Sequence, residues 1–175
     1  MKVLSGLSWP EEGLPGFYCV VAEKIKPITG SLGTPATYLE IIHEFESPSL
    51  LPIFEDMRNC KKIEAVYAPN DLKYASFYRE FTRWRREENA NVHLRASNVS
   101  SFEAGVIKIK EYVLKKTLVF SEQSIIKRQL RVFSKLSLKE EKEFYGVSAL
   151  THVISVFRKT SSAGSTEELS PRLWY

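Results

Sequence analysis

The first quarter of the chain alternates between apolar runs and turn residues. Apolar and β-branched residues predominate at positions 2–9, 17–25 and 37–45. Pro10 to Gly16 ends the first run, and the stretch 27–35, with two prolines and two glycines, ends the second. Runs bounded in this way are typical of strands joined as antiparallel hairpins. We therefore expect three strands in a meander.

Beyond residue 46 the pattern alternates between helical and strand periods. Ser47 and Pro48 match an N-cap followed by proline at the first helical position, which predicts a helix to about residue 59. A strand is expected at 61–67, and a helix from Asp71. That helix carries one aromatic stripe: Tyr74, Phe77, Tyr78, Phe81 and Trp84. The stripe fits a base-stacking surface or, more commonly, a helix face that packs on the core.

The second half continues the alternation and ends in helices. We expect a strand at 92–96, an amphipathic helix from 102 to about 116, a short strand at 117–120 and a basic helix at 122–135. Ser137 and Glu140 form a capping box, which predicts a last helix at 137–158. Its expected apolar face consists of Phe144, Val147, Leu150 or Thr151, Ile154 and Phe157.

Ser148 and His152 lie on the shoulder of this last helix, one turn apart. Beyond residue 159 the chain is rich in serine and has no period, so we expect a single domain at 1–159 and a flexible tail at 160–175. The tail ends in Trp174 and Tyr175, which offers a peptide for a protein partner as an alternative to plain disorder.

Composition narrows the class of protein. Of the 175 residues, 43% are apolar and 26% are charged, as in an ordinary globular domain. No apolar run approaches the roughly 20 residues that cross a bilayer, and the start lacks a signal peptide, so we expect a cytoplasmic protein without a membrane segment. Two cysteines, Cys19 and Cys60, and three histidines, His43, His93 and His152, show no metal-type spacing.

Basic residues are concentrated between positions 108 and 135. The net charge is +4, which permits nucleic-acid binding without demonstrating it. The expected DNA-binding set is Lys108, Lys110, Lys115, Lys127, Arg128, Arg131 and Lys135. The same density fits a solvated helix face, so the pattern leaves both interpretations open.

The order of elements, three strands and then alternating helices and strands, predicts an α/β fold. It is the ribonuclease H-like order, with a mixed central sheet of about five strands and helices on both faces. Three segments carry a closer likeness, at residues 6–10, 66–69 and 146–154, supported by the helix–strand–helix order between residues 96 and 133. In these segments the chain resembles the nuclease domain of the large terminase subunit of tailed bacteriophages, which packages DNA.

The resemblance implies a two-metal nuclease, in which clustered carboxylates hold two Mg²⁺ or Mn²⁺ ions. The acid positions of the family fall on Ser8, on Pro69 or its neighbour, and on Ser148, and none of these is acidic. Asp71 and His152 are the substitute catalytic candidates. Each also has a simpler interpretation, since Asp71 suits a helix N-cap and His152 a helix-edge histidine.

Other acids near the expected site are Glu11, Glu12 and Glu64, which are also ordinary turn or surface residues. We assign no metal ligand and expect no cofactor, with Mg²⁺ or Mn²⁺ needed only if the domain is an active two-metal DNA endonuclease. The sequence thus favours a terminase-like domain for DNA packaging or DNA binding that lacks nuclease activity. Its expected partners are double-stranded DNA and other phage packaging proteins. The alternatives are a non-enzymatic protein-interaction module and an active nuclease with rearranged ligands.

Overall fold

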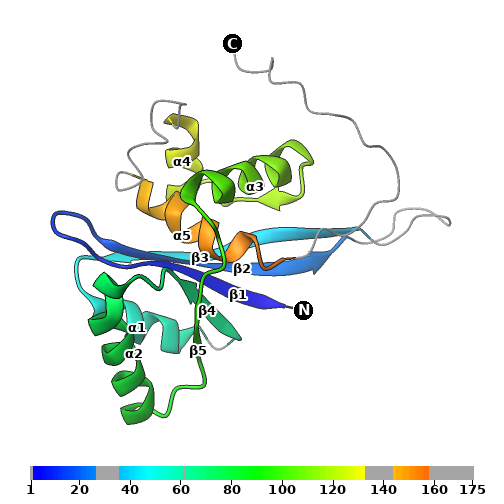
Figure 1. Cartoon of the computed structure of the whole chain (residues 1–175). Helices are drawn as coiled ribbons and strands as arrows, with labels where there is room; N and C mark the ends of the chain where they lie inside the picture. The colour runs from blue at the N-terminus through cyan, green and yellow to red at the C-terminus, as the bar shows by residue number, and fades with distance from the viewer. Residues whose placement is uncertain (1, 27–35, 61, 133–143, 158–175) are drawn as a thin grey trace.

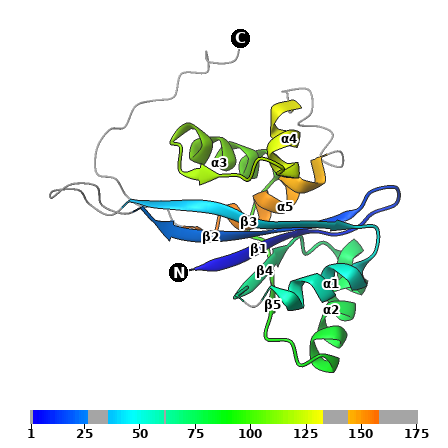
Figure 2. The same cartoon turned by 180° about the vertical axis from the view of Figure 1, so that it is seen from behind.

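A computed structural model of the chain describes residues 2–26, 36–60, 62–132 and 144–157. A central sheet divides the molecule into two halves, each with its own apolar core (Figure 1). Helices α3, α4 and α5 cover one face of the sheet, and α1 and α2 cover the other (Figures 1 and 2). The expected mixed α/β fold with helices on both faces is confirmed.

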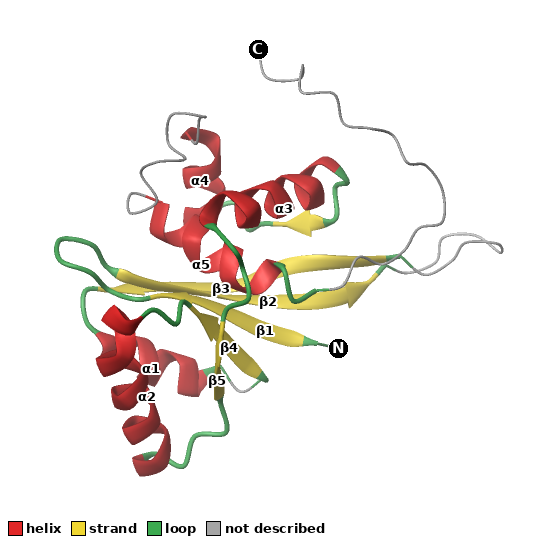
Figure 3. Cartoon of the chain, viewed as in Figure 1, coloured by secondary structure: helices red, strands yellow, loops and turns green. Residues whose placement is uncertain are grey.

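The sheet has six strands in the order β5-β4-β1-β2-β3-β6. Figure 3 shows the strands in yellow between the two groups of red helices. The strands are β1 (Val3–Ser8), β2 (Gly16–Ile25), β3 (Thr37–Ser47), β4 (Ala65–Ala68), β5 (His93–Ala96) and β6 (Leu118–Val119). The first three strands pair antiparallel, whereas β4 lies parallel to β1, β5 parallel to β4, and β6 parallel to β3. An antiparallel meander with parallel strands added beside β1 is the ribonuclease H-like arrangement that the sequence pattern predicted.

The helices are α1 (Leu50–Asn59), α2 (Ala75–Glu87), α3 (Phe102–Leu114), α4 (Ile125–Val132) and α5 (Tyr145–Ile154), with a 3-10 turn η1 (Leu72–Tyr74) before α2. The N-cap of α1 is Ser49, so the prediction that Ser47 caps it and Pro48 begins it is wrong by two residues. Strand β3 continues to Ser47, because its pairing with Gly16 extends the ladder to the start of β2.

The aromatic stripe of α2 packs inward, as the simpler interpretation predicted. Phe81 and Trp84 are buried against Phe54 of α1, with ring centroids 5.2 Å from it in both cases. At the start of the helix, Phe77 and Tyr78 lie 5.6 and 5.5 Å from the ring of Trp9, which follows β1. The stripe therefore anchors α2 to α1 and to Trp9, and its buried members Phe81 and Trp84 are not available for stacking with bases.

Helix α5 is buried on all sides, which corrects the prediction of a single apolar face. Every residue from 146 to 154 is buried, because α5 lies between the sheet and helices α3 and α4 (Figure 1). A helix that is apolar all round belongs to an interior layer. Its described part ends at Ile154 and not near residue 158, and the capping box of Ser137 and Glu140 lies outside the described residues.

Two glycines allow this close packing. A Cβ atom on Gly6 of β1 would lie 1.9 Å from the backbone oxygen of Ala149 in α5. A Cβ atom on Gly105 of α3 would lie 2.3 Å from Cβ of Thr151. Both distances are far below van der Waals contact, so larger residues at these positions would push α5 out of its layer.

Candidate functional site

The carboxyl ends of β1 and β4 meet at one edge of the sheet, because the two strands are parallel neighbours. Ser8 is the last residue of β1, and Pro69 directly follows β4. Helix α5 packs across these strands and brings Tyr145, Ser148 and His152 to the same edge. In open α/β sheets this edge is where ligands usually bind.

A hollow of about 140 Å³ opens there, which we call the carboxyl-edge hollow. It is lined by Ser8, Trp9, Glu11, Leu14, Pro15, Pro69, Asp71, Lys73, Tyr74, Tyr145, Ser148 and His152. All three positions that the terminase resemblance assigns to acids, and both substitute candidates, thus border one space. The volume suits ions or a few waters and is below the roughly 300 Å³ of a small-molecule pocket.

The acids of the hollow have other partners or face solvent. Glu11 accepts hydrogen bonds from Tyr74 Oη at 2.5 Å and from Lys73 Nζ at 3.0 Å. Asp71 is exposed and precedes η1, and its side chain makes no capping hydrogen bond there. The expected N-cap role of Asp71 is therefore wrong as to the hydrogen bond, although its position before the helical turn is confirmed.

Burial changes the chemistry of the phenols beside the hollow. Desolvation and the hydrogen bond to Glu11 raise the pKa of Tyr74 to about 12, which keeps its hydroxyl protonated as a donor. Burial likewise raises the pKa of Tyr145 to about 12, and the nearby positive charge of Arg128 opposes that rise. Tyr145 donates to Glu46 at 2.9 Å. These tyrosines are hydrogen-bond donors and not proton acceptors.

His152 is buried in the wall of the hollow, with 9% of its surface exposed. Its Nδ1 atom has no hydrogen-bond partner among the described residues. Burial lowers the pKa of His152 to about 4, so the imidazole is neutral at neutral pH. A base with so low a pKa takes up a proton poorly near pH 7, which weakens the case for His152 as a general base.

The described residues contain one group of three or more His, Cys, Asp and Glu side chains with ligand atoms close enough to share a metal ion. It consists of His43, Asp56 and Cys60, on the α1 side of the sheet. No such group in the described part of the chain includes Asp71, Glu11 or His152. The fold therefore brings the predicted catalytic positions to one hollow but does not bring three metal ligands together there.

The predicted DNA-binding residues lie on the two outer helices of the α5 side. Lys115, Arg128 and Arg131 are exposed, whereas Lys108, Lys110 and Lys127 are half-buried. Lys108 pairs with Glu111 of the same helix at 3.9 Å. Lys135 lies outside the described residues.

A second basic surface lies on α2, where the sequence suggests only a solvated helix end with Arg83, Arg85 and Arg86 beside Glu87 and Glu88. Arg79, Arg83 and Arg86 of α2 are exposed and follow one another at helical spacing. They border a shallow groove together with Tyr78, Thr82 and Glu87. The spacing of the arginines along α2 is the signal that would have found this surface.

Comparison with known proteins adds little to this picture. No protein-family model matches the chain, and no curated protein sequence matches it. A solved structure of the fowlpox virus Holliday junction resolvase is similar over 88% of this chain and 96% of that chain, with 10% identity and a TM-score of 0.43. A likeness at this level establishes no shared activity. Among the described residues, no helix is long and apolar enough to cross a membrane.

Proposed function

We propose that this chain is a ribonuclease H-like domain, akin to the nuclease domain of packaging terminases, that binds double-stranded DNA without cleaving it. The observation that carries the proposal is the lining of the carboxyl-edge hollow. Ser8, Pro69 and Ser148 border it at the positions where the resemblance requires acids. Hydroxyls and a prolyl ring carry no negative charge, so they cannot balance two divalent cations. In packaging, the partners of such a domain are DNA and other packaging proteins.

Helix α4 is the proposed contact for the DNA backbone. Its start is held by Glu44 of β3, which accepts the Ile125 N–H at 2.6 Å and the Ser124 hydroxyl. Its middle is joined to α5, because Gln129 Oε1 accepts the Val147 N–H at 3.0 Å. A helix held at these two points presents its charges without a large entropic cost on binding.

The basic face of α4 adjoins the hollow. The exposed Arg128 is near enough to Tyr145 for its positive charge to lower the pKa of the phenol. Tyr145 in turn lines the hollow. Arg131 follows on the same side of α4, one turn later. A duplex that contacts these arginines through its phosphates would therefore lie beside the place where a nuclease of this fold would act.

Binding to a short duplex, followed by fluorescence anisotropy at several salt concentrations, tests the proposal. We expect affinity to fall steeply with added salt, because phosphate contacts release counterions. The Arg128→Gln/Arg131→Gln double variant should lower the salt slope by about 2, roughly one for each lost contact. The matched control is Arg83→Gln/Arg86→Gln on α2, which should leave the slope unchanged.

Two results would overturn the proposal as stated. Absence of binding at low salt, or binding independent of salt, would remove DNA as a ligand. A lowered slope in the α2 variant but not in the α4 variant would place the DNA contact on the opposite face of the sheet.

One observation favours a second candidate function, an active nuclease with rearranged ligands. Asp71, Glu11 and His152 all line the hollow, so each has access to a substrate bound there. Two observations argue against an active nuclease. Glu11 is hydrogen-bonded to Lys73 and Tyr74, and the pKa of His152 is low. An incision assay separates the two functions and is described below.

A further inference from the structure

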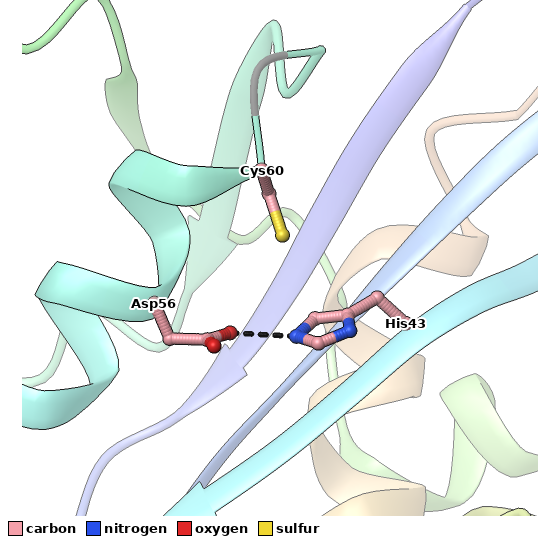
Figure 4. A group of neighbouring side chains, drawn as sticks. All are labelled: His43, Asp56 and Cys60. Atoms are coloured by element: carbon pink, nitrogen blue, oxygen red, sulfur yellow. Dashed lines mark hydrogen bonds and ion pairs between the residues drawn. The ribbon is translucent and has the colours of Figure 1, made fainter.

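We propose that His43, Asp56 and Cys60 form a binding site for Zn²⁺ on the α1 side of the sheet, separate from the carboxyl-edge hollow. The three side chains come from β3, from α1 and from the residue after α1, and they point toward one another (Figure 4). One ligand atom of each lies within 4.8 Å of the others. The site does not depend on the proposed DNA binding.

A bulge in β3 creates this convergence. In the β2–β3 ladder Val21 pairs with Ile41 and Val20 pairs with His43, so Ile42 is an extra residue. Without the bulge, His43 would share a face with Ile41, which packs in the core on the α5 side. The extra residue turns His43 to the α1 side, where its ring lies 5.6 Å from that of Tyr18.

The three ligand atoms already lie within 4.8 Å of one another, so modest shifts would bring them to the spacing of a tetrahedral zinc site. Zn–N and Zn–O distances of about 2.0–2.2 Å and a Zn–S distance of about 2.3 Å put neighbouring ligand atoms roughly 3.3–3.8 Å apart. His43 Nε2 and Asp56 Oδ2 are 2.6 Å apart as a hydrogen bond. A bound ion would increase the distance between these two atoms by less than about 1 Å and would bring the Cys60 thiolate closer. Small rotations of the side chains would be sufficient for both changes.

The buried hydroxyl of Tyr18 contacts two of the three proposed ligands. Tyr18 is fully buried and donates a hydrogen bond to Asp56 Oδ2, and its oxygen lies 3.6 Å from Cys60 Sγ. Because Tyr18 is buried and its hydroxyl donates to Oδ2, it orients the carboxylate of Asp56. Outer partners of this kind fix the direction of metal ligands.

The donor set selects the metal. One thiolate, one imidazole and one carboxylate suit Zn²⁺, whereas Mg²⁺ and Mn²⁺ favour oxygen ligands alone. Three protein ligands leave a fourth position for water, and the side chains of His43 and Asp56 are 36% and 26% exposed, so an ion can enter from solvent. Bound there, it would tie the end of α1 to strand β3.

Titration of the full chain with Co²⁺ as a spectroscopic probe and Zn²⁺ as competitor tests the site. We expect one ion per chain, visible bands of tetrahedral Co²⁺ and a thiolate-to-cobalt charge-transfer band that Zn²⁺ abolishes. Cys60→Ser should remove the charge-transfer band, and His43→Gln should weaken binding at least about 100-fold. His93→Gln, at an exposed histidine of β5, is the matched control and should change neither.

Alkylation of the unaltered protein provides a readout that needs no variant. Zn²⁺ should protect Cys60 from N-ethylmaleimide, whereas Cys19 is fully buried and should react only on unfolding. The proposal is overturned if no ion binds above background. It is equally overturned if the charge-transfer band persists in Cys60→Ser, or if Zn²⁺ gives Cys60 no protection.

Discussion

The carboxyl-edge hollow is assembled from three separate parts of the chain, and the His43–Asp56–Cys60 cluster from two, strand β3 and the end of α1. The two regions also differ in whether the fold and the side chains point to the same role. The fold defines where the hollow lies, at the ends of β1 and β4 beside α5, yet its key positions are Ser8, Pro69 and Ser148. The cluster has metal-ligating side chains at a place to which the fold assigns no role. Under the proposed function, the fold preserves a location whose chemistry has changed.

The largest expected effect concerns the packing that creates the hollow. Gly6→Ala should lower the free energy of unfolding by at least about 3 kcal/mol, because the added methyl meets the backbone of α5 and not a flexible side chain. Urea unfolding followed by circular dichroism measures the change. Gly13→Asn is the control, since a Cβ there meets nothing within 4 Å and asparagine tolerates the positive φ of 78°.

An unchanged stability in Gly6→Ala would mean that α5 does not lie against β1 at this distance. The hollow would then not be bordered by α5, and our description of the carboxyl-edge hollow would be wrong.

The next effect tests whether His152 is a buried neutral residue or a functional one. The pKa of His152 is about 4 in the fold and near 6.5 when unfolded, so between these values the unfolded chain binds more protons. The free energy of unfolding is therefore unaffected by the titration of His152 above about pH 6.5. It decreases as the pH falls from 6.5 toward 4, by a total of about 3 kcal/mol. His152→Leu should abolish this part of the pH dependence and leave stability at pH 7 within about 1 kcal/mol.

Urea unfolding of both proteins at intervals between pH 4 and pH 7 measures the difference. A parallel pH dependence in the two proteins would show that folding does not change the pKa of His152, so that its imidazole can take up a proton near neutral pH. That result would support the hypothesis of an active nuclease with rearranged ligands. It would also weaken the conclusion that the hollow lacks catalytic chemistry.

Much of the fold could be predicted, because local patterns matched tertiary packing. Apolar runs and turn residues located every strand of the sheet, and the order of elements was sufficient for the ribonuclease H-like topology. The burial of α5 could not be read from its own residues. It results from α3 and α4 closing over its outer side, with Gly105 admitting α3, so an inner helix was taken for a surface one.

The candidate sites divide in the same way. The resemblance assigned Ser8, Pro69 and Ser148 to one place, and they do border one hollow. The cluster could not be predicted from the sequence, because His43 faces Asp56 only as a result of the bulge at Ile42. Strict alternation along β3 would place His43 on the opposite face of the sheet. Sequence spacing finds ligands within one element and not ligands that a register shift brings together.

The most direct test of the central claim, a retained location with lost chemistry, is incision of supercoiled plasmid DNA by the purified full chain with Mn²⁺ or Mg²⁺. Binding to the same plasmid should be followed in parallel by gel shift, so that a bound but intact substrate can be recognised. We predict binding at low salt with no nicked or linear product at any ion concentration. Metal-dependent nicking that is lost in Asp71→Ala would contradict the account and establish a rearranged nuclease.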